Sequence, residues 1–312
     1  MAYRIWTPEE EILLKNLVST GLYSYRDMEK FFPGRTLSSL TKHARIYLNI
    51  HNDIYKQHKY TYTKGFFATP NILNSYVAGF WAADGSIRDI PNASPRLRLE
   101  LGEEDLEYLK NMKKILGYTG VIAPFHKGNS TTHWFSITID EEYKRNLADN
   151  FGIVQRKTHH LTPPNLTTFD LRFAFLVGLL DGDGCTHINS RNESLSLGYT
   201  SSSIAAVEWV KRVTEECNLP TLRKKPSGII RKVTNVNAYS IVLNGAKVVA
   251  FIKLVQAFAA HYNLPILRRK WDTPRLNEYI KSFEIRYPKF SYTPPSFPLD
   301  PVPIETTPSI AA

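Results

Sequence analysis

Two aspartates stand in matching surroundings at the ends of two apolar segments. Residues 75–88 read SYVAGFWAADGSIR and residues 174–187 read AFLVGLLDGDGCTH, which places Asp84 opposite Asp183, 99 residues further along the chain. Two adjacent carboxylates repel each other, and a divalent cation such as Mg²⁺ removes the repulsion because hard oxygen ligands suit it. Metals held between two such carboxylates can activate a water and stabilise the 3′ oxygen that leaves in phosphodiester hydrolysis.

Each aspartate is expected to close a helix, and the two helices are expected to pack side by side. Gly79 and Ala83 are four residues apart, and Gly178 and Gly182 repeat this spacing. Small residues at this spacing share one helix face and let two backbones approach closely. A parallel pair would bring both carboxylates together, with the carbonyls of Ala83 and Gly182 as further metal ligands. A single Asp-Gly can equally be a helix stop, but two matching copies favour the metal site.

The similarity continues downstream of each aspartate and defines a long internal repeat. The first copy predicts a hairpin over 86–101, a helix with apolar spacing from Leu106, and a second hairpin over 121–139. The second copy predicts hairpins over 185–200 and 222–243 on either side of a helix. The helices that close the two copies are expected over 141–151 and 246–261. This order is αββαββα twice, which predicts two pseudo-symmetric halves of the α+β class.

The chain also has regions outside the repeat. The first 65 residues predict a small all-α domain of three short helices, because Thr7-Pro8-Glu9-Glu10 is a typical helix start. The last 25 residues contain seven prolines and predict a disordered tail. The expected domains are a helical module over 1–50, a linker over 51–70, a first half over 71–165, a second half over 166–287 and the tail over 288–312.

Composition restricts the class of protein. The chain has 312 residues, 39 Lys and Arg against 29 Asp and Glu, and a formal charge of +10 at pH 7. Its 43% hydrophobic and 22% charged residues exclude a globally disordered or collagen-like chain. Two cysteines are too few for a disulfide framework, and no apolar run predicts a membrane span or a secretion signal. We therefore expect an intracellular protein, whose charge favours a polyanionic partner without identifying one.

The two apolar segments resemble the paired LAGLIDADG motifs of a monomeric homing endonuclease. The matching stretches are VAGFWAADG at 77–85 and LVGLLDGDG at 176–184, within a resemblance that spans residues 70–285. The resemblance implies a four-stranded antiparallel sheet in each half, and a saddle formed by both sheets over the DNA major groove. Ala82 is the one departure, because the family pattern has Asp there, although this is not the position of the metal ligand.

The activity implied by the resemblance is site-specific cleavage of double-stranded DNA. Such an enzyme would use Mg²⁺, with Mn²⁺ as a substitute, and would bind a long, pseudo-asymmetric target as a monomer. It would cut both strands across the minor groove and leave 3′ overhangs. A gene in a mobile intron, or a free-standing gene in a phage or an organelle, would encode it, which implies a phage-infected or bacterial cytoplasm or an organelle as its location.

The resemblance also implies a basic residue close to the active site near the end of each half. Lys157 in IVQRK and Lys270 in LPILRRK are the matching positions. Their implied role is to orient water and stabilise charge on the phosphate. Glu103 and Ser201 align where the family often has a polar residue that positions water. The expected catalytic residues are Asp84, Asp183, Lys157 and Lys270.

Alternation along the expected strands divides each sheet into a core face and an open face. In the first half Leu97, Leu99 and Leu101 form the core face, which leaves the residues between them open. Arg, Asn and His suit purine edges in the major groove, and other basic residues contact phosphate. Without the aspartates, the same pattern would fit a solvated surface. The expected DNA-binding residues of the two halves are Arg88, Arg96, Arg98, Glu100, His187, Asn189, Arg191, Ser194, Ser196, Arg223, Lys225 and Arg231.

Residues 6–48 resemble a Myb/SANT-type helix-turn-helix module. The segment opens with WTPEEEILL, and Tyr25 stands near the place of the second tryptophan of such modules. A third helix over 37–48 would read the major groove. Its expected core residues are Leu37, Leu40, Ala44 and Tyr47, and its expected DNA-facing residues are Ser39, Lys42, His43 and Arg45. The alternative is a SANT-like domain that docks on protein.

Two alternatives to the endonuclease remain open. An RNA maturase that assists group I intron splicing can have the same fold and keep both aspartates. The helix-turn-helix resemblance favours DNA over RNA as the partner. A DNA-binding regulator derived from the LAGLIDADG family would tend to lose the aspartates, whereas this chain keeps both.

Overall fold

The chain divides into two compact units, Met1–Thr61 and Tyr62–Ala312, which are described separately. Within the described part, every helix is too short or too polar to cross a membrane. The computed structural model describes residues 5–20, 23, 25–50, 60–89, 94–155, 161–189, 191, 193–222, 227–234 and 236–298.

The smaller unit consists of short helices around an apolar core. Thr7 begins the first helix with a capping box, in which its hydroxyl accepts from the Glu10 N–H at 3.3 Å and the Glu10 carboxylate accepts from the Thr7 N–H at 3.1 Å. Leu14, Met28 and Leu40 are fully buried in the core between the helices. The elements are α1 (Pro8–Ser19), α2 (Tyr25–Met28), η1 (Glu29–Phe31), α3 (Leu37–Lys42) and the π-helix η2 (His43–Tyr47).

The π-helix changes which side chains of the third helix face solvent. A π-helical turn holds more residues than an α-helical turn, so side chains after Lys42 rotate out of the α-helical register. Tyr47 is consequently exposed at 65%, whereas His43 is 7% exposed, bonded to Glu11 and stacked on Trp6. The expectations that His43 faces DNA and that Tyr47 packs in the core are therefore wrong. Lys42 and Arg45 are both exposed.

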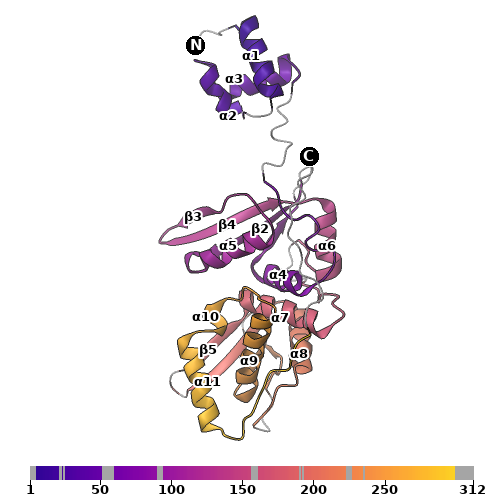
Figure 1. Ribbon diagram of the computed structural model, residues 1–312, viewed down its shortest axis with the longest axis vertical. Helices are drawn as coiled ribbons and strands as arrows, with labels where there is room; N and C mark the ends of the chain where they lie inside the picture. The colour runs from indigo at the N-terminus through magenta and orange to yellow at the C-terminus, as the bar shows by residue number, and fades with distance from the viewer. Residues whose placement is uncertain are drawn as a thin grey trace. The chain divides into compact units, whose positions relative to one another are not determined.

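The larger unit contains two halves with the same order of elements (Figure 1). The first half consists of α4 (Ile72–Asp84), β1 (Ser86–Arg88), β2 (Arg96–Gly102), η4 (Glu103–Asp105), α5 (Leu106–Ile115), β3 (Ala123–Lys127), β4 (Ser130–Thr138) and α6 (Glu141–Phe151). The second half consists of α7 (Phe169–Asp183), β5 (Cys185–Asn189), β6 (Ser194–Ser201), α8 (Ile204–Glu216), β7 (Arg231–Lys232), β8 (Tyr239–Asn244) and α9 (Ala246–His261). The predicted order, αββαββα twice, and the α+β class are confirmed.

Each half forms one four-stranded antiparallel sheet, with strand orders β1-β2-β4-β3 and β5-β6-β8-β7. Leu97 pairs with Ile137 and Leu99 pairs with Phe135 across β2 and β4, and all four side chains are fully buried. The helices α5, α8 and α9 contact the strands on this apolar side. Because successive residues of a strand point to opposite faces, the intervening residues form the open face of each sheet.

The chain continues beyond the repeat with two helices, α10 (Arg268–Trp271) and α11 (Pro274–Arg286). Neither helix was predicted from the sequence, although Thr273-Pro274 is a helix start in which the Thr273 hydroxyl accepts from the Leu276 N–H at 3.2 Å. The hairpin expected over 222–243 forms with a first strand of only two residues, Arg231–Lys232.

The proline-rich segment after α11 packs on the second half. Phe290 is 7% exposed and contacts Phe283, and Phe297 contacts Phe258 on α9. The Tyr262 hydroxyl donates to the Pro298 carbonyl at 3.0 Å. The expectation of a disordered tail is therefore wrong for residues 288–298, while residues 299–312 lie outside the described part. Aromatic residues among the prolines supply the apolar surface that composition alone did not reveal.

Candidate active site

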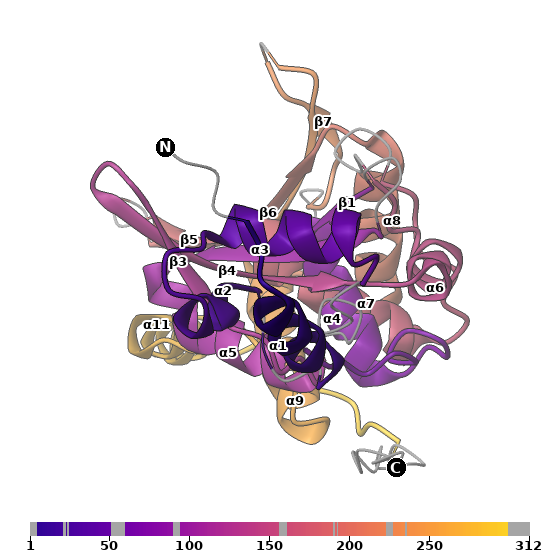
Figure 2. The ribbon, with the colours of Figure 1, turned by 90° about the horizontal axis from the view of Figure 1, so that it is seen from above.

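The helices α4 and α7 lie side by side in both views of the larger unit (Figures 1 and 2). A β-carbon at Gly79 would lie 2.0 Å from the Phe175 carbonyl oxygen, and a β-carbon at Gly178 would lie 2.0 Å from the Tyr76 carbonyl oxygen. The two contacts are related by the 99-residue offset of the repeat. The structure thus places both glycines where the helix backbones meet.

The same packing brings the C-terminal ends of both helices together. A β-carbon at Gly182 would lie 2.2 Å from the β-carbon of Ala83 and 3.1 Å from Oδ2 of Asp84. The Asp84 carboxylate therefore lies beside the last turn of α7, which ends at Asp183. Both carboxylates are exposed. The two predicted metal ligands thus stand at adjoining helix ends, where a substrate can reach them.

The donor set at these helix ends fits a hard divalent cation. Two exposed carboxylates add their negative charge to the negative ends of two helix dipoles. Within the described ranges, no group of three or more His, Cys, Asp and Glu side chains could hold a metal ion. A cation at Asp84 and Asp183 would therefore need waters and a substrate phosphate as additional ligands. Mg²⁺ commonly has this coordination, with one or two carboxylates from the protein.

Lys270 lies at the end of α7. Its Nζ donates to the carbonyl oxygens of Gly182 at 2.7 Å and Leu180 at 3.2 Å, and the residue is 8% exposed. Burial lowers the pKa of Lys270, whereas the charges of Asp181, Asp84 and Asp183 act to raise it. The structure therefore places one expected catalytic lysine beside the carboxylates, bonded to a carbonyl that we expected to bind metal. Lys157, its counterpart, lies outside the described residues.

Asp181 is a buried acid that was not among the residues expected at the site. Its Oδ2 accepts from the Tyr76 hydroxyl at 2.6 Å and from the Leu267 N–H at 3.2 Å, and its Oδ1 accepts from Nε1 of Trp271. Burial raises the pKa of Asp181 to about 6, although these three hydrogen bonds act to lower it. The sequence did carry a signal for this acid. Asp181 lies 99 residues after Ala82, so in the second copy of the repeat it occupies the position at which the family pattern has Asp.

An ion pair joins the two halves close to this acid. Arg269 donates through Nε and Nη2 to the two carboxylate oxygens of Asp105 at 2.8 and 2.6 Å. The Asp105 side chain is 8% exposed, whereas that of Arg269 is 50% exposed. Two parallel bonds of this kind fix the geometry of both groups. The basic segment Arg268–Lys270, which follows α9, is therefore anchored on the first half through Arg269 and on α7 through Lys270.

The open face of the first sheet carries the four residues expected there, but two of them bind each other. Nη2 of Arg98 donates to Glu100 at 2.7 Å, and its guanidinium lies 4.3 Å from the centre of the Trp134 ring. Glu100 also accepts from the Thr132 hydroxyl at 2.7 Å, and this bond holds the pKa of Glu100 below its usual range. Trp134 was not among the residues expected on this face. The remaining two residues, Arg88 and Arg96, are exposed and directly paired across β1 and β2.

The open face of the second sheet is polar rather than strongly basic in the described part. His187 pairs with Ser196 and Asn189 pairs with Ser194 across β5 and β6, so all four side chains share one face. The Asn189 side chain accepts from the Arg191 N–H at 2.9 Å. Two of the other residues expected in this half, Arg191 and Arg231, are exposed. The other two, Arg223 and Lys225, lie outside the described residues.

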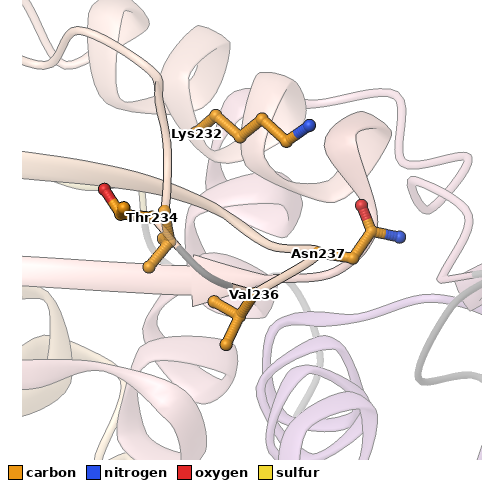
Figure 3. Close-up of a pocket in the computed structure, with 5 residues that line it drawn as sticks. Lys232, Thr234, Val236 and Asn237 are labelled. Atoms are coloured by element: carbon orange, nitrogen blue, oxygen red, sulfur yellow. The ribbon is translucent and has the colours of Figure 1, made fainter.

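A depression of about 540 Å³ lies at the tip of the hairpin formed by β7 and β8 (Figure 3). It contains none of the residues around Asp84 and Asp183, so it is separate from the candidate active site. Its lining residues are Lys232, Val233, Thr234, Val236 and Asn237.

The family of LAGLIDADG-like domains matches this chain twice, over residues 71–152 and 170–256. These ranges contain both helix-end aspartates and both sheets. The chain belongs to the LAGLIDADG-like domain family.

Solved structures of meganucleases resemble the chain. The meganuclease I-SmaMI bound to uncleaveable DNA is 15% identical, with a TM-score of 0.42, over 70% of this chain and 90% of that chain. The LAGLIDADG meganuclease I-AabMI bound to uncleaved DNA is 14% identical, with a TM-score of 0.43, over 72% of this chain and 94% of that chain. I-DmoI in complex with DNA and Mn is 13% identical, with a TM-score of 0.36, over 55% of this chain and 90% of that chain. No curated protein matches the chain in sequence.

Proposed function

We propose that the protein is a site-specific endonuclease that hydrolyses double-stranded DNA with the help of Mg²⁺. The observation that carries this proposal is the position of Asp84 and Asp183. Both are exposed at the adjoining ends of α4 and α7, in a chain of the LAGLIDADG-like family. A structural protein would gain nothing from two carboxylates at the negative ends of two packed helices.

Asp84 and Asp183 would hold the cation, together with oxygen atoms of the helix ends. The bound Mg²⁺ would supply the Lewis acidity that activates water and stabilises the leaving oxygen. Lys270, whose Nζ donates to the Gly182 carbonyl at 2.7 Å, would place its ammonium beside the same helix ends and orient the groups around the phosphate. In the reaction, the water oxygen would bond to phosphorus as the bond from phosphorus to the 3′ oxygen breaks, and the proton that the water loses would end on the 3′ oxygen, which leaves a 5′ phosphate and a 3′ hydroxyl. We propose staggered cuts that leave 3′ overhangs.

The open faces of the two sheets would bind the DNA. The exposed Arg88 and Arg96 on the first sheet suit guanine edges or phosphates, whereas His187 and Asn189 on the second sheet offer weaker charge and more selective hydrogen bonding. This difference between the faces supports a pseudo-asymmetric target, which one chain would bind as a monomer.

The smaller unit would add a second DNA contact as a helix-turn-helix module. Its third helix exposes Lys42 and Arg45, which suits a polyanionic partner. Ile46 and Tyr47 are each 65% exposed beside them, and apolar groups of this kind can contact thymine methyl groups.

The test is a cleavage selection on the full chain. The protein is incubated with Mg²⁺ and either a randomised duplex library or the DNA that flanks its gene, and the ends of the products are sequenced. We expect discrete cuts on both strands that need a divalent cation and that vanish with EDTA. A chain that binds one sequence tightly without cutting it would instead be a DNA-binding regulator, and the proposal would be wrong.

A further inference from the structure

The carboxylate of Asp181 binds the chain on both sides of Lys270. It accepts from the Leu267 N–H, three residues before the lysine, at 3.2 Å, and from Nε1 of Trp271, the residue after the lysine. The Tyr76 hydroxyl completes the set at 2.6 Å. The acid is fully buried, so its bonds are not in competition with water. One side chain of α7 therefore ties Leu267 and Trp271 together, and the segment between them contains the lysine.

The lysine side chain has its own contacts, and these depend on where the backbone lies. Nζ of Lys270 reaches the Gly182 carbonyl at 2.7 Å, between Asp181 and Asp183. The adjacent Arg269 is tied to Asp105 of the first half through two hydrogen bonds. This arrangement orients the lysine towards the helix ends rather than towards solvent.

The first half lacks the residues that make this arrangement. Ala82 stands at the position that matches Asp181, and Thr158 stands at the position that matches Trp271. An alanine side chain offers no acceptor, so residue 82 cannot make the hydrogen bonds that Asp181 makes in the second half. The two halves of the proposed enzyme therefore differ at the residue that supports the lysine of the second half.

We propose that Asp181 is a positioning residue, which holds Lys270 in place for the cleavage of one of the two DNA strands. This inference rests on the proposed endonuclease function. A displaced lysine would misplace its ammonium relative to the phosphate, and misplacement by about 1 Å costs on the order of 100-fold in rate.

The first experiment compares the two strands of one duplex. The target recovered from the cleavage selection is labelled separately on each strand, and the single-turnover rate of each cut is measured with Mg²⁺. We expect Asp181→Asn to slow one strand by about 10- to 100-fold, and this strand to be the one that Lys270→Ala slows. Nicked duplex should accumulate. Asp149→Asn, which changes an exposed acid on α6, is the matched control and should leave both rates unchanged.

A second, milder variant keeps the test valid if Asp181→Asn does not fold. Tyr76→Phe removes one bond to Asp181, and Phe175 already stands at the matching position of the repeat. We expect it to slow the same strand by a few-fold. Equal slowing of both strands by Asp181→Asn and Tyr76→Phe would overturn the inference, because a general loss of packing acts on both centres.

The second experiment needs no DNA. Lysines of the folded full chain are acetylated with sulfo-N-hydroxysuccinimide acetate and quantified by mass spectrometry. We expect Asp181→Asn to raise the labelling rate of Lys270 by about 10-fold, because local opening exposes Nζ. Lys253, which is paired with Glu284 at 2.6 Å, is the internal control and should not change.

The two experiments separate the inference from the function on which it rests. A wild-type chain that cuts no DNA would overturn the endonuclease, and the labelling of Lys270 would still report whether Asp181 holds it. An active wild type with unchanged Lys270 labelling and unchanged strand rates in Asp181→Asn would overturn the inference alone.

Discussion

Gly178 on α7 lies against the backbone of Tyr76 on α4, so closely that a β-carbon at residue 178 would stand 2.0 Å from the Tyr76 carbonyl oxygen. A carbonyl oxygen of a packed helix cannot rotate away as the end of a side chain can. The distance between the two helices, and with it the distance between the two helix-end carboxylates, therefore depends on the absence of a methyl group at Gly178 and at its counterpart Gly79.

Gly178→Ala should lower the free energy of unfolding of the larger unit by about 1–3 kcal/mol, which is typical of overpacking. Urea denaturation of the full chain followed by circular dichroism measures the change. Gly65→Ala is the control, because a β-carbon there has nothing within 4 Å and the backbone needs no positive φ. An equal loss in the two variants would contradict the close helix contact.

Asp84→Asn and Asp183→Asn should each abolish double-strand cleavage and preserve DNA binding, because each removes a charged oxygen from the proposed metal site without changing the side-chain shape. Cleavage of the selected duplex and its binding by fluorescence anisotropy check the two outcomes. Asp149→Asn is the control. Normal cutting of both strands by either variant would show that the metal site lies elsewhere.

Glu100→Gln should strengthen DNA binding and steepen its salt dependence. The change removes a negative charge from the open face and releases Arg98 from its 2.7 Å ion pair. Release of about one further counterion would change the slope of log K against log salt by about 1. Anisotropy titrations at several salt concentrations measure this slope. Glu142→Gln, on the exposed side of α6, should leave the slope as it is.

The Cys217 thiol should make the protein less stable at alkaline pH. Burial raises the pKa of Cys217 from its ordinary value of 9.0 to about 12. Because the folded pKa is the higher one, the contribution to stability is complete below the ordinary pKa and is lost as the pH rises towards the folded pKa. The stability difference between wild type and Cys217→Ala should therefore shrink by about 1 kcal/mol from about pH 8 to about pH 10. A constant difference in urea denaturation would contradict this.

Arg35→Lys should loosen the smaller unit alone. The Arg35 guanidinium donates to Glu10 at 2.6 Å and to the Ile5 carbonyl at 2.8 Å, and lies 4.2 Å from the centre of the Trp6 ring. An ammonium reproduces neither the fork nor the stacking. Hydrogen exchange of the full chain should be faster in residues 5–50, because the free energy of opening falls there by about 1–2 kcal/mol. Arg26→Lys, at an exposed arginine, is the control.

Much of the fold follows from sequence periodicity. The expected helices over 141–151 and 246–261 have the observed bounds, because their apolar spacing and their neighbouring turns are local signals. The alternation of Leu97, Leu99 and Leu101 likewise predicts the observed core face of β2. The order of helices and strands could be predicted because both copies of the repeat show the same pattern.

The site could be predicted only where the repeat itself carries the signal. Asp84 and Asp183 match each other, whereas the partners of Asp181 are up to 105 residues away and have no pattern in common. The exposure of Tyr47, seven residues after the buried Leu40, comes from a π-helix, which no periodicity of period 3.6 anticipates. Trp134 holds Arg98 through a contact between strands, so neither residue alone suggests it.

The bond between Tyr76 and Asp181 also limits how the chain could be divided. A symmetric dimer of two first halves would carry two tyrosine hydroxyls and, at Ala82, no acid to accept them. A symmetric dimer of two second halves would carry two such acids and, at Phe175, no hydroxyl to donate to them. The halves share a fold but have become complementary parts, and neither can replace the other without loss of this buried hydrogen bond.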